Sequence, residues 1–329
     1  MKLRLVVPVD VDAPTGGNTY DLALAESLRR AGDVVELVRA GPPDLRDVVR
    51  RSWDGPTLVD GLLACADPGA ISSARVAVLV HMPLALQTGL TPEEAAAIDR
   101  REREALHAAA LVVATSQWSA SHLRTHHGLA GVAVAPPGVA VAPVGAGSDP
   151  PLLVHVAALL PHKDQLGVVA ALGGLAELPW QARLAGSVDR DPDYASTVRS
   201  AVRAAGLEGR IDVVGEVPRD TAWAGADLAL LPSLVETYGL VVTEALARGV
   251  PAVVSDGGPA EALGQAPTGE RPGVVVPAGD RDALRLALRR WLTDPEQRRR
   301  LRAAALARRQ TLAGWESTAD HVRQALRDL

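Results

Sequence analysis

The sequence predicts an α/β protein of two domains, each a parallel β-sheet covered by helices on both faces. Three observations support this prediction. Short apolar runs alternate with longer helical patterns along the chain, as in parallel sheets whose strands are joined by helices. The pattern is interrupted at residues 140–151, which are dominated by Pro, Gly, Ala and Asp, and then restarts. A length of 329 residues also fits two domains.

Residues 1–143 form the first predicted domain. The apolar run Leu3–Val9 is its first strand, and a Gly-rich turn then leads into a helix that ends at Gly32. The remaining elements alternate in the same way: a helix over 19–31, strands over 34–38, 76–81, 111–116 and 132–135, and a helix over 93–109.

Residues 150–312 form the second predicted domain. Its strands are expected over 152–157, 181–185, 211–214, 228–231, 252–255 and 274–276, and its helices over 166–175, 194–205, 240–248, 280–293 and 295–310. Two Rossmann-like halves with a cleft between them are the simplest architecture. Ligands of open parallel sheets lie at the carboxyl ends of the strands, so the strand-to-helix turns are where functional residues are expected.

Composition excludes several functions. A net charge of −5 gives no electrostatic case for nucleic-acid binding. Cys65 is the only cysteine, so neither an intramolecular disulfide nor a cysteine-based metal site is expected. No window approaches the ~18 apolar residues of a membrane span, and Pro8 and Asp10 interrupt the N-terminal apolar run too early for a signal peptide. The expected compartment is the cytoplasm.

Two turns in the first half have functional potential. Gly16 and Gly17 follow the first strand, and paired glycines before a helix let the backbone approach an anionic ligand. A plain turn with a helix cap is the alternative. The segment lacks the G-x-G-x-x-G fingerprint, which disfavours a dehydrogenase. His81 ends a buried strand and should point toward the cleft, with a satisfied structural histidine as the alternative.

Three further histidines, His122, His126 and His127, lie near the end of a helix. We interpret them as solvent-facing or capping residues. No acidic residue accompanies them at a metal-ligand spacing in the sequence, so no zinc site is predicted there.

Lys163 lies in the strand-to-helix turn that opens the second half. A lysine at this place can meet a phosphate, and a surface lysine is the alternative. The only other lysine is Lys2, whereas arginine carries nearly all the positive charge. A lysine kept where arginine is the usual cation indicates a specific role.

Glu236 and Glu244 are separated by seven residues, the first in a loop that opens a helix and the second within that apolar helix. A carboxylate embedded among apolar residues requires a polar partner. The helix start near Gly239 offers free N–H groups and a positive dipole end to a diphosphate. Two carboxylates beside a diphosphate would repel it unless they accept hydrogen bonds from hydroxyl groups, which a nucleotide-sugar supplies. A helix start with one stabilising Glu is the alternative.

These segments resemble glycosyltransferase family four, the retaining nucleotide-sugar enzymes of the GT-B fold. The most specific matches are residues 231–261, which contain the Glu-x7-Glu motif, and residues 273–280. Supporting matches are Gly16-Gly17, His81, 113–116, 136–139, 161–163, 184–187 and 213–217. Tyr238 stands where the family usually has Phe. The resemblance implies two Rossmann-like domains with parallel sheets facing across a cleft, and a C-terminal helix over about 314–329 that packs back on the N-terminal, acceptor domain.

The resemblance also implies a role for each matched residue. Lys163 would neutralise the donor diphosphate, Glu244 would bind ribose hydroxyls and Glu236 would lie beside the transferred sugar. His81 would touch the sugar near the reacting carbon or the acceptor. The implied catalytic residues are therefore Glu236, His81 and Lys163. The implied donor-binding residues are Gly16, Gly17, Lys163, Gly186, Val217, Glu236, Thr237, Tyr238, Gly239, Leu240 and Glu244.

One departure from the family concerns the diphosphate. The family often has an arginine shortly before the lysine, where this chain has Ala158. Arg183 or Arg219 would substitute for it, or diphosphate binding would be weaker. The loops expected at the cleft show no acidic metal pair, so no metal and no cofactor are predicted. The nucleotide-sugar, a UDP- or GDP-sugar, is a substrate.

The acceptor is open: a small molecule, a glycan or a lipid-linked molecule. Alternatives to a retaining hexosyltransferase are a GT-B sugar phosphorylase or epimerase, and a catalytically silent GT-B subunit. The arginine-dense helix 297–309 is interpreted as a solvated face, with at most peripheral contact to anionic lipid as the alternative.

Overall fold

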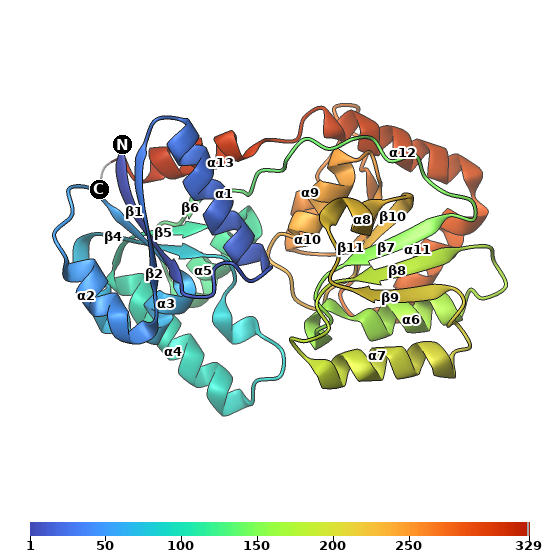
Figure 1. The fold of residues 1–329 in the computed structure, drawn as a ribbon, viewed down its shortest axis with the longest axis horizontal. Helices are drawn as coiled ribbons and strands as arrows, with labels where there is room; N and C mark the ends of the chain where they lie inside the picture. The colour runs from blue at the N-terminus through green and yellow to red at the C-terminus, as the bar shows by residue number, and fades with distance from the viewer. Residues whose placement is uncertain (328) are drawn as a thin grey trace. The chain divides into compact units, whose positions relative to one another are not determined.

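The structure is a computed structural model that describes residues 1–327 and 329, with the side chains of all of these except residues 73 and 74. The chain divides into two compact units. Unit 1 comprises Met1–Gly138 and Ala313–Leu329, and unit 2 comprises Val139–Leu312. Each unit contains one six-stranded parallel sheet with helices on both faces (Figure 1). The predicted α/β class with two parallel sheets is therefore confirmed.

Unit 1 has the strand order β2-β1-β3-β4-β5-β6. Its strands are β1 (Lys2–Pro8), β2 (Val34–Ala40), β3 (Thr57–Asp60), β4 (Ser73–Val80), β5 (Ala109–Ala114) and β6 (Ala133–Val134). Its helices are α1 (Gly16–Arg30), α2 (Leu45–Arg50), α3 (Gly61–Ala66), α4 (Pro92–Ala108), α5 (Gln117–His127) and α13 (Trp315–Ala325), with short 3-10 turns η1 (Pro42–Asp44), η2 (Pro68–Ala70) and η3 (Leu84–Leu86). Strand β3 and helices α2 and α3 were missing from the sequence prediction.

Two cores hold unit 1 together, one on each face of its sheet. Alternate residues of β1 divide between them, as the two-residue period of a strand requires. Leu3, Leu5 and Val7 pack on one face with residues of α1 and α13, and Val6 packs on the other with residues of α2 to α5. Tyr20 of α1 meets Trp315 of α13 edge to face, with ring centroids 5.6 Å apart. The C-terminal helix is thus part of the unit 1 core.

Unit 2 has the strand order β12-β11-β10-β7-β8-β9. Its strands are β7 (Leu152–Val156), β8 (Gln181–Ala185), β9 (Ile211–Gly215), β10 (Ala226–Leu231), β11 (Ala252–Ser255) and β12 (Gly273–Val276). Its helices are α6 (Gln165–Gly173), α7 (Pro192–Ala204), α8 (Arg219–Trp223), α9 (Leu240–Ala247), α10 (Gly258–Leu263), α11 (Arg281–Thr293) and α12 (Pro295–Arg309), with a 3-10 turn η4 (Pro161–Lys163). The short helices α8 and α10 were not predicted.

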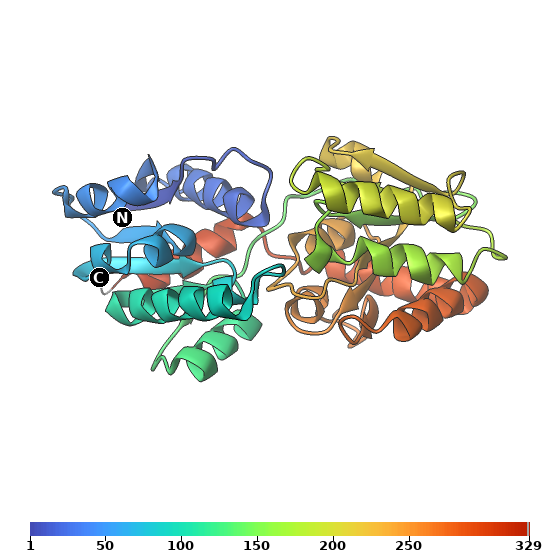
Figure 2. The same ribbon diagram turned by 90° about the horizontal axis from the view of Figure 1, so that it is seen from below.

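The sheet of unit 2 is also covered on both faces. Helices α6, α7 and α11 lie on one face, where they are seen side by side in Figure 2. Helices α8, α9 and α10 bury apolar residues on the other face, together with Ala305 of α12. Fully burying one Leu or Val side chain contributes about 1.5–3 kcal/mol, so these layers fix the positions of the loops at the strand ends.

Each sheet has one point at which the strand order reverses. In unit 1 this point lies between β1 and β3, and in unit 2 between β7 and β10. Ligands of open α/β sheets bind beyond the carboxyl ends of the strands at such switch points. Both reversal points therefore mark where a site is expected.

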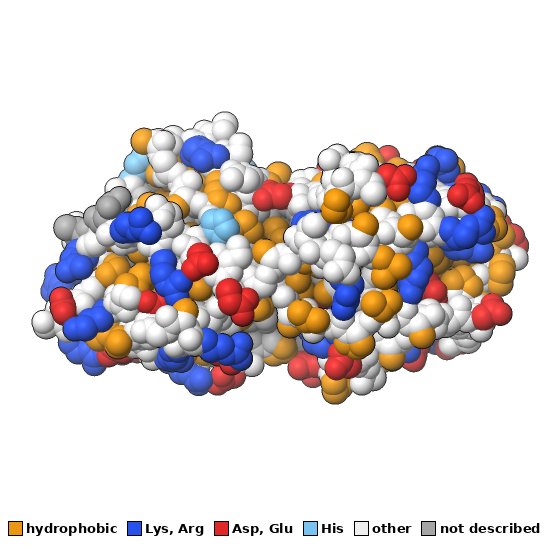
Figure 3. Space-filling view, turned by 90° about the horizontal axis from the view of Figure 1, so that it is seen from above, with side chains coloured by type: hydrophobic (Ala, Val, Ile, Leu, Met, Phe, Trp, Pro, Cys, Tyr) orange, Lys and Arg blue, Asp and Glu red, His pale blue; other side chains and the backbone are white. Residues whose placement is uncertain are grey.

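The surface of the molecule is of mixed charge. On the face seen in Figure 3, acidic and basic side chains are interspersed over both units, in keeping with the net charge of −5. Within the described residues, the helices are all too short or too polar to cross a lipid bilayer.

Candidate functional site

The predicted lysine and the first predicted carboxylate meet at the switch point of unit 2. Lys163 follows β7 and Glu236 follows β10, and these two strands are neighbours in the sheet. Lys163 Nζ donates a hydrogen bond to Glu236 Oε2 at 2.6 Å. The two side chains are 19% and 15% exposed, so the pair is reachable from solvent. Residues 73 positions apart in sequence thus form one charged centre.

Burial alone would raise the pKa of Glu236. The Lys163 ammonium, its hydrogen bond and the Thr237 backbone N–H overcome this effect, and the pKa of Glu236 is lowered from its ordinary value. The Thr237 N–H donates to Glu236 Oε1 at 3.1 Å. Glu236 is therefore a carboxylate at neutral pH, with both oxygens engaged.

Buried polar contacts hold the Lys163 turn in place. His155 of β7 is fully buried and its Nε2–H donates to the Lys163 carbonyl at 3.1 Å. Burial lowers the pKa of His155 to about 4, so the ring stays neutral. The Leu234 N–H donates to the His162 carbonyl at 2.8 Å and links this turn to the Glu236 loop. Sequence reasoning missed His155 because it looks like an ordinary strand residue.

Two glycines shape the start of α9. Gly239 has φ +87° and caps the helix, and a Cβ there would lie 2.6 Å from Leu231 Cδ2. Gly258 lies directly against the peptide group between Thr237 and Tyr238, because a Cβ on Gly258 would lie 2.1 Å from the Thr237 carbonyl atoms. Tyr238 packs partly buried in the adjoining core. The backbone of 237–240 is thus held from two sides, and Gly258 is a positioning residue that the sequence prediction did not identify.

Glu244 lies on α9 and has two polar neighbours from α8. The Trp223 indole N–H donates to Glu244 Oε2 at 3.2 Å, and Arg219 Nη1 lies 3.6 Å from the same oxygen. The Glu244 side chain is 18% exposed. The polar partners that an embedded carboxylate requires are therefore the Trp223 indole and the half-exposed Arg219 guanidinium. The sequence prediction missed Trp223 because it did not include α8.

The two arginines named as substitutes for the missing cation behave differently. Arg183 donates through Nη1 to the carbonyls of residues 221, 222 and 224, so its guanidinium is engaged at the end of α8. Arg219 is 49% exposed and lies beside Glu244. Gly186 lies under the loop at Ala158, since its Cβ would lie 2.0 Å from the Ala157 carbonyl oxygen.

A second charged cluster lies at the switch point of unit 1. His81 follows β4, Asp60 ends β3 and Asp21 lies on α1. His81 Nε2 lies 2.9 Å from Asp21 Oδ1 and 3.4 Å from Asp60 Oδ2. Both carboxylates are buried, and Asp21 Oδ2 has no hydrogen-bond partner among the described residues. The expectation that no acidic pair lies at such a loop is wrong here, because Asp60 belongs to the unpredicted strand β3.

These contacts set the charge of His81. Burial would lower the pKa of His81, but the two aspartates raise it to about 10. Burial raises the pKa of Asp21 to about 6, against the effect of His81. A Cβ on Gly17 would lie 3.1 Å from His81 Cδ2. Gly17, in the first turn of α1, therefore lies tightly against the imidazole, and the ring is an imidazolium at neutral pH.

Two other interpretations of the sequence are corrected by the structure. His127 is fully buried against Glu102, with Nε2 and Oε2 3.0 Å apart, and His126 pairs with Asp99 at 2.5 Å. Acidic residues from α4 therefore accompany these histidines. In the arginine-dense helix α12, Arg302 and Arg309 donate to backbone carbonyls of unit 2, so a purely solvated face is wrong for these two.

The structure divides the predicted site residues between the units. Gly16, Gly17 and His81 belong to unit 1, and the other predicted residues belong to unit 2. Within unit 2, Lys163, Glu236 and Thr237 are in direct contact, and Glu244 lies about one turn into the helix that Gly239 caps. Val217 packs partly buried in the core beneath α9.

Comparison with known proteins finds a family model and curated relatives that match the chain. Residues 141–308 match the family model "Glycosyl transferases group 1". The chain is 32% identical over 266 residues to the D-inositol 3-phosphate glycosyltransferase of Kineococcus radiotolerans, covering 72% of this chain and 61% of that protein. It is 37% identical over 118 residues to the lipopolysaccharide core mannosyltransferase LpcC of Rhizobium leguminosarum, covering 35% of this chain and 33% of that protein. The chain thus spans less than two thirds of these curated relatives.

Solved structures share the fold. The sucrose-phosphate synthase of Thermosynechococcus elongatus superposes with a TM-score of 0.80 at 20% identity, covering 100% of this chain and 98% of that one. Anabaena HepE in complex with UDP-glucose superposes with a TM-score of 0.78 at 18% identity, covering 100% of both chains. These neighbours fit the two-domain GT-B fold that the sequence predicted.

Proposed function

Because the chain belongs to the group 1 glycosyl transferases, we propose that it transfers a hexose-type sugar from a UDP- or GDP-sugar to an acceptor hydroxyl, with retention of anomeric configuration and without a divalent metal. The observation that carries this proposal is the Lys163–Glu236 pair at the start of α9, with Glu244 further along the helix. A cation, a helix N-terminus and two carboxylates match the diphosphate and the hydroxyls of such a donor.

Donor binding would exchange partners within this group. A diphosphate offers Lys163 more negative charge than the single carboxylate of Glu236, and the N-terminus of α9 adds N–H donors and its dipole. Glu236, released from Lys163, then accepts hydrogen bonds from sugar hydroxyls. Glu244 accepts hydrogen bonds from the ribose, while the Trp223 N–H holds its other side. Carboxylates are acceptors only, so hydroxyl donors are the partners they suit.

The same residues would stabilise the departing group. As the bond to the sugar breaks, negative charge grows on the diphosphate oxygen, and preorganised donors aimed at that charge lower the barrier. That oxygen takes the proton of the acceptor hydroxyl on the same face of the sugar, which gives retention. His81, charged and fixed by two aspartates, is suited to donate hydrogen bonds to the sugar or the acceptor. It is unsuited to act as a base.

The relatives supply the range of partners. HepE was solved with UDP-glucose, and the curated relatives are a D-inositol 3-phosphate glycosyltransferase and a mannosyltransferase. A UDP- or GDP-hexose with a small-molecule, glycan or lipid-linked acceptor is therefore proposed for this chain, acting in the cytoplasm.

A ligand screen tests the donor assignment. Thermal unfolding is measured with UDP, GDP, ADP and their sugars. A nucleotide at one hundred times its Kd stabilises the folded chain by about 2.7 kcal/mol, which is a clear rise in Tm. Turnover with the stabilising donor is then followed with EDTA and with added Mn²⁺ or Mg²⁺. Unchanged turnover in EDTA is expected. No stabilising nucleotide, or strict dependence on either metal, contradicts the proposal.

The two carboxylates separate binding from turnover. Glu244→Ala should weaken nucleotide diphosphate binding roughly tenfold to a hundredfold, since a hydrogen bond to a charged group contributes about 1.5–3 kcal/mol. Glu236→Ala should chiefly lower kcat. Isothermal titration and initial rates measure the two effects, and Glu270→Ala, a half-exposed glutamate outside this group, serves as the control. The reverse pattern would overturn the assigned roles.

A further inference from the structure

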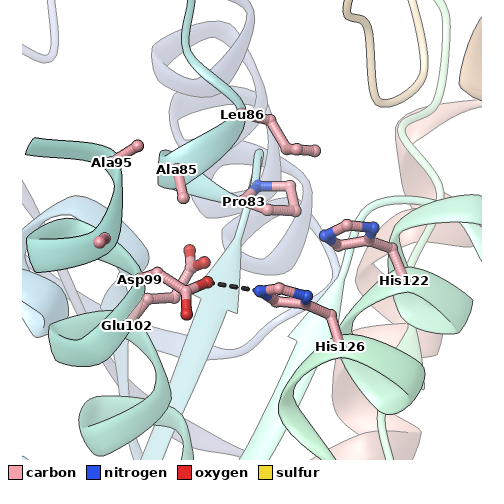
Figure 4. A pocket seen from close by; sticks show the side chains of 9 residues that line it. Pro83, Ala85, Leu86, Ala95, Asp99, Glu102, His122 and His126 are labelled. Carbon is pink, nitrogen blue, oxygen red and sulfur yellow. Dashed lines mark hydrogen bonds and ion pairs between the residues drawn. The ribbon is translucent and has the colours of Figure 1, made fainter. Parts of the chain in front are cut away.

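A pocket of about 290 Å³ lies in unit 1, and its lining includes none of the charged residues at the switch points. One wall is apolar and is made by Pro83, by the η3 turn and by the first turns of α4. The rest of the lining carries ionisable side chains. Figure 4 shows Asp99 and Glu102 of α4 and His122 and His126 of α5 directed toward this space. The mechanism proposed above uses none of these four residues.

The two helices present potential metal ligands at helical spacing. Asp99 and Glu102 are three residues apart on α4, and His122 and His126 are four apart on α5, so each pair shares one helix face. The His122 and His126 rings stack with centroids 5.3 Å apart and an interplanar angle of 19°. His126 Nε2 already lies 2.5 Å from Asp99 Oδ1.

Buried contacts stiffen this arrangement. Glu102 is almost fully buried and accepts hydrogen bonds from the Leu84 N–H at 2.9 Å and from His127 Nε2 at 3.0 Å. His127 is fully buried, and within the part of the chain that the structure describes its Nδ1 has no hydrogen-bond partner. If Nε2 carries the proton that faces Glu102, Nδ1 keeps a lone pair in the protein interior. The imidazole and its carboxylate are arranged as in the carboxylate–histidine pairs that support metal centres.

We propose that Asp99, His126 and His127 bind one divalent transition-metal ion, Zn²⁺ or an ion of similar ligand preference, with the fourth position open toward the pocket beside His122. One ligand atom from each of these three residues lies within 4.8 Å of the others. Ligand atoms around a tetrahedral zinc with bonds of about 2.0–2.2 Å lie about 3.4 Å apart. Small side-chain movements therefore close the site. The two imidazole ligands favour zinc, copper or nickel over magnesium.

Such an ion would hold α4 and α5 together. It would take no part in binding the donor diphosphate, which is assigned to unit 2. The proposal is independent of the transfer reaction, because its readout is metal binding.

The test uses the full chain, stripped with EDTA and desalted. Zn²⁺ is titrated in competition with a chromophoric chelator. One equivalent per chain with a Kd in the micromolar range or tighter is expected, together with a rise in Tm in Zn²⁺ and no such rise in Mg²⁺. His126→Ala and Asp99→Asn should each weaken Zn²⁺ binding at least tenfold. His321→Ala removes an exposed histidine of α13 whose Nδ1 lies 2.6 Å from the Ser317 carbonyl oxygen of the same helix, and it should leave binding unchanged.

The outcomes separate clearly. Binding below one equivalent, binding that survives His126→Ala, or Mg²⁺ binding of equal strength would overturn the site. The apo variants are first compared with the parent by circular dichroism and Tm. If His126→Ala fails to fold, His126→Gln keeps a polar side chain of similar reach and still removes the imidazole, so the same loss of Zn²⁺ affinity is required of it.

Discussion

The two units place opposite charge arrangements at the same position of their sheets. At the switch point of unit 2, one cation faces one anion, Lys163 and Glu236, and both are partly exposed. At the switch point of unit 1, one histidine faces two buried carboxylates, Asp21 and Asp60. The first arrangement is neutral and can exchange partners with a ligand. The second keeps an excess of negative charge, so it holds its histidine charged.

This difference shows how one fold serves two purposes. A diphosphate can replace Glu236 beside Lys163, because water reaches both side chains and the exchange keeps the ammonium paired. The aspartates beside His81 are out of contact with solvent, and separating them from the imidazolium would leave an unpaired buried charge, which costs several kcal/mol. Unit 2 is therefore suited to bind and release a charged ligand, whereas unit 1 offers a fixed donor.

The largest expected effect comes from removing the exchangeable cation. Lys163→Met should lower kcat on the order of a thousandfold, because an electrostatic donor at a departing group is lost and Glu236 is left unpaired. Initial rates measure the effect. Lys2→Met is the matched control, since Lys2 forms an exposed ion pair with Asp54, and such pairs contribute about 0–1 kcal/mol. Near-normal turnover of Lys163→Met would contradict the view that the Lys163–Glu236 pair, unlike the His81 cluster, exchanges partners with the ligand.

The second prediction concerns the charged cluster of His81, Asp21 and Asp60 in unit 1. His81, with a pKa raised to about 10, should remain protonated at pH 8. Asp60→Asn should lower the pKa of His81 by about 1 to 3 pH units, since one nearby negative charge is lost. NMR titration of the His81 imidazole signals in the parent and in the variant measures both values. A wild-type His81 that titrates near 6.5 would contradict the two-carboxylate arrangement.

The same shift has a consequence for stability. The folded pKa of His81 lies above that of the unfolded chain, so its contribution is fully present below pH 6.5 and is lost as the pH rises toward about 10. Glu236 has the opposite sign. Its pKa is lowered from 4.5, so its contribution is present above that value and is lost at lower pH. The free energy of unfolding, measured in urea across pH, should therefore be reduced at different ends of the pH range in the two variants. His81→Gln should lose stability chiefly at low pH, and Glu236→Gln chiefly at high pH.

The sequence predicted unit 2 better than unit 1 for a physical reason. Around Glu236 and Glu244 the ligand-facing groups lie on one loop and the helix that follows, so local spacing contains most of the geometry. The prediction of Lys163 needed only the rule that strand ends meet at one edge of a parallel sheet. These residues were found before the structure, and the contact of Lys163 with Glu236 agrees with their placement.

The residues that were missed depend on contacts between distant segments. Asp60 ends a strand of four residues, Thr57–Asp60, too short to give a clear period. The apolar residues that follow Pro56 are the sequence signal from which this strand could have been predicted. The acids beside His126 and His127 come from another helix, α4, so no spacing within the histidine segment contains them. Trp223 was hidden in the short helix α8.

The smallest predicted effect tests whether Glu244 depends on a neutral donor as Glu236 depends on a charged one. Trp223→Phe keeps most of the ring and removes the N–H that Glu244 accepts at 3.2 Å. Nucleotide diphosphate affinity should fall roughly threefold to tenfold, the value of one hydrogen bond. Trp291→Phe is the matched control, because Trp291 is a buried indole of the same unit whose N–H has no hydrogen-bond partner in the described residues. Equal losses in both variants would mean that ring packing, and not the hydrogen bond, positions Glu244.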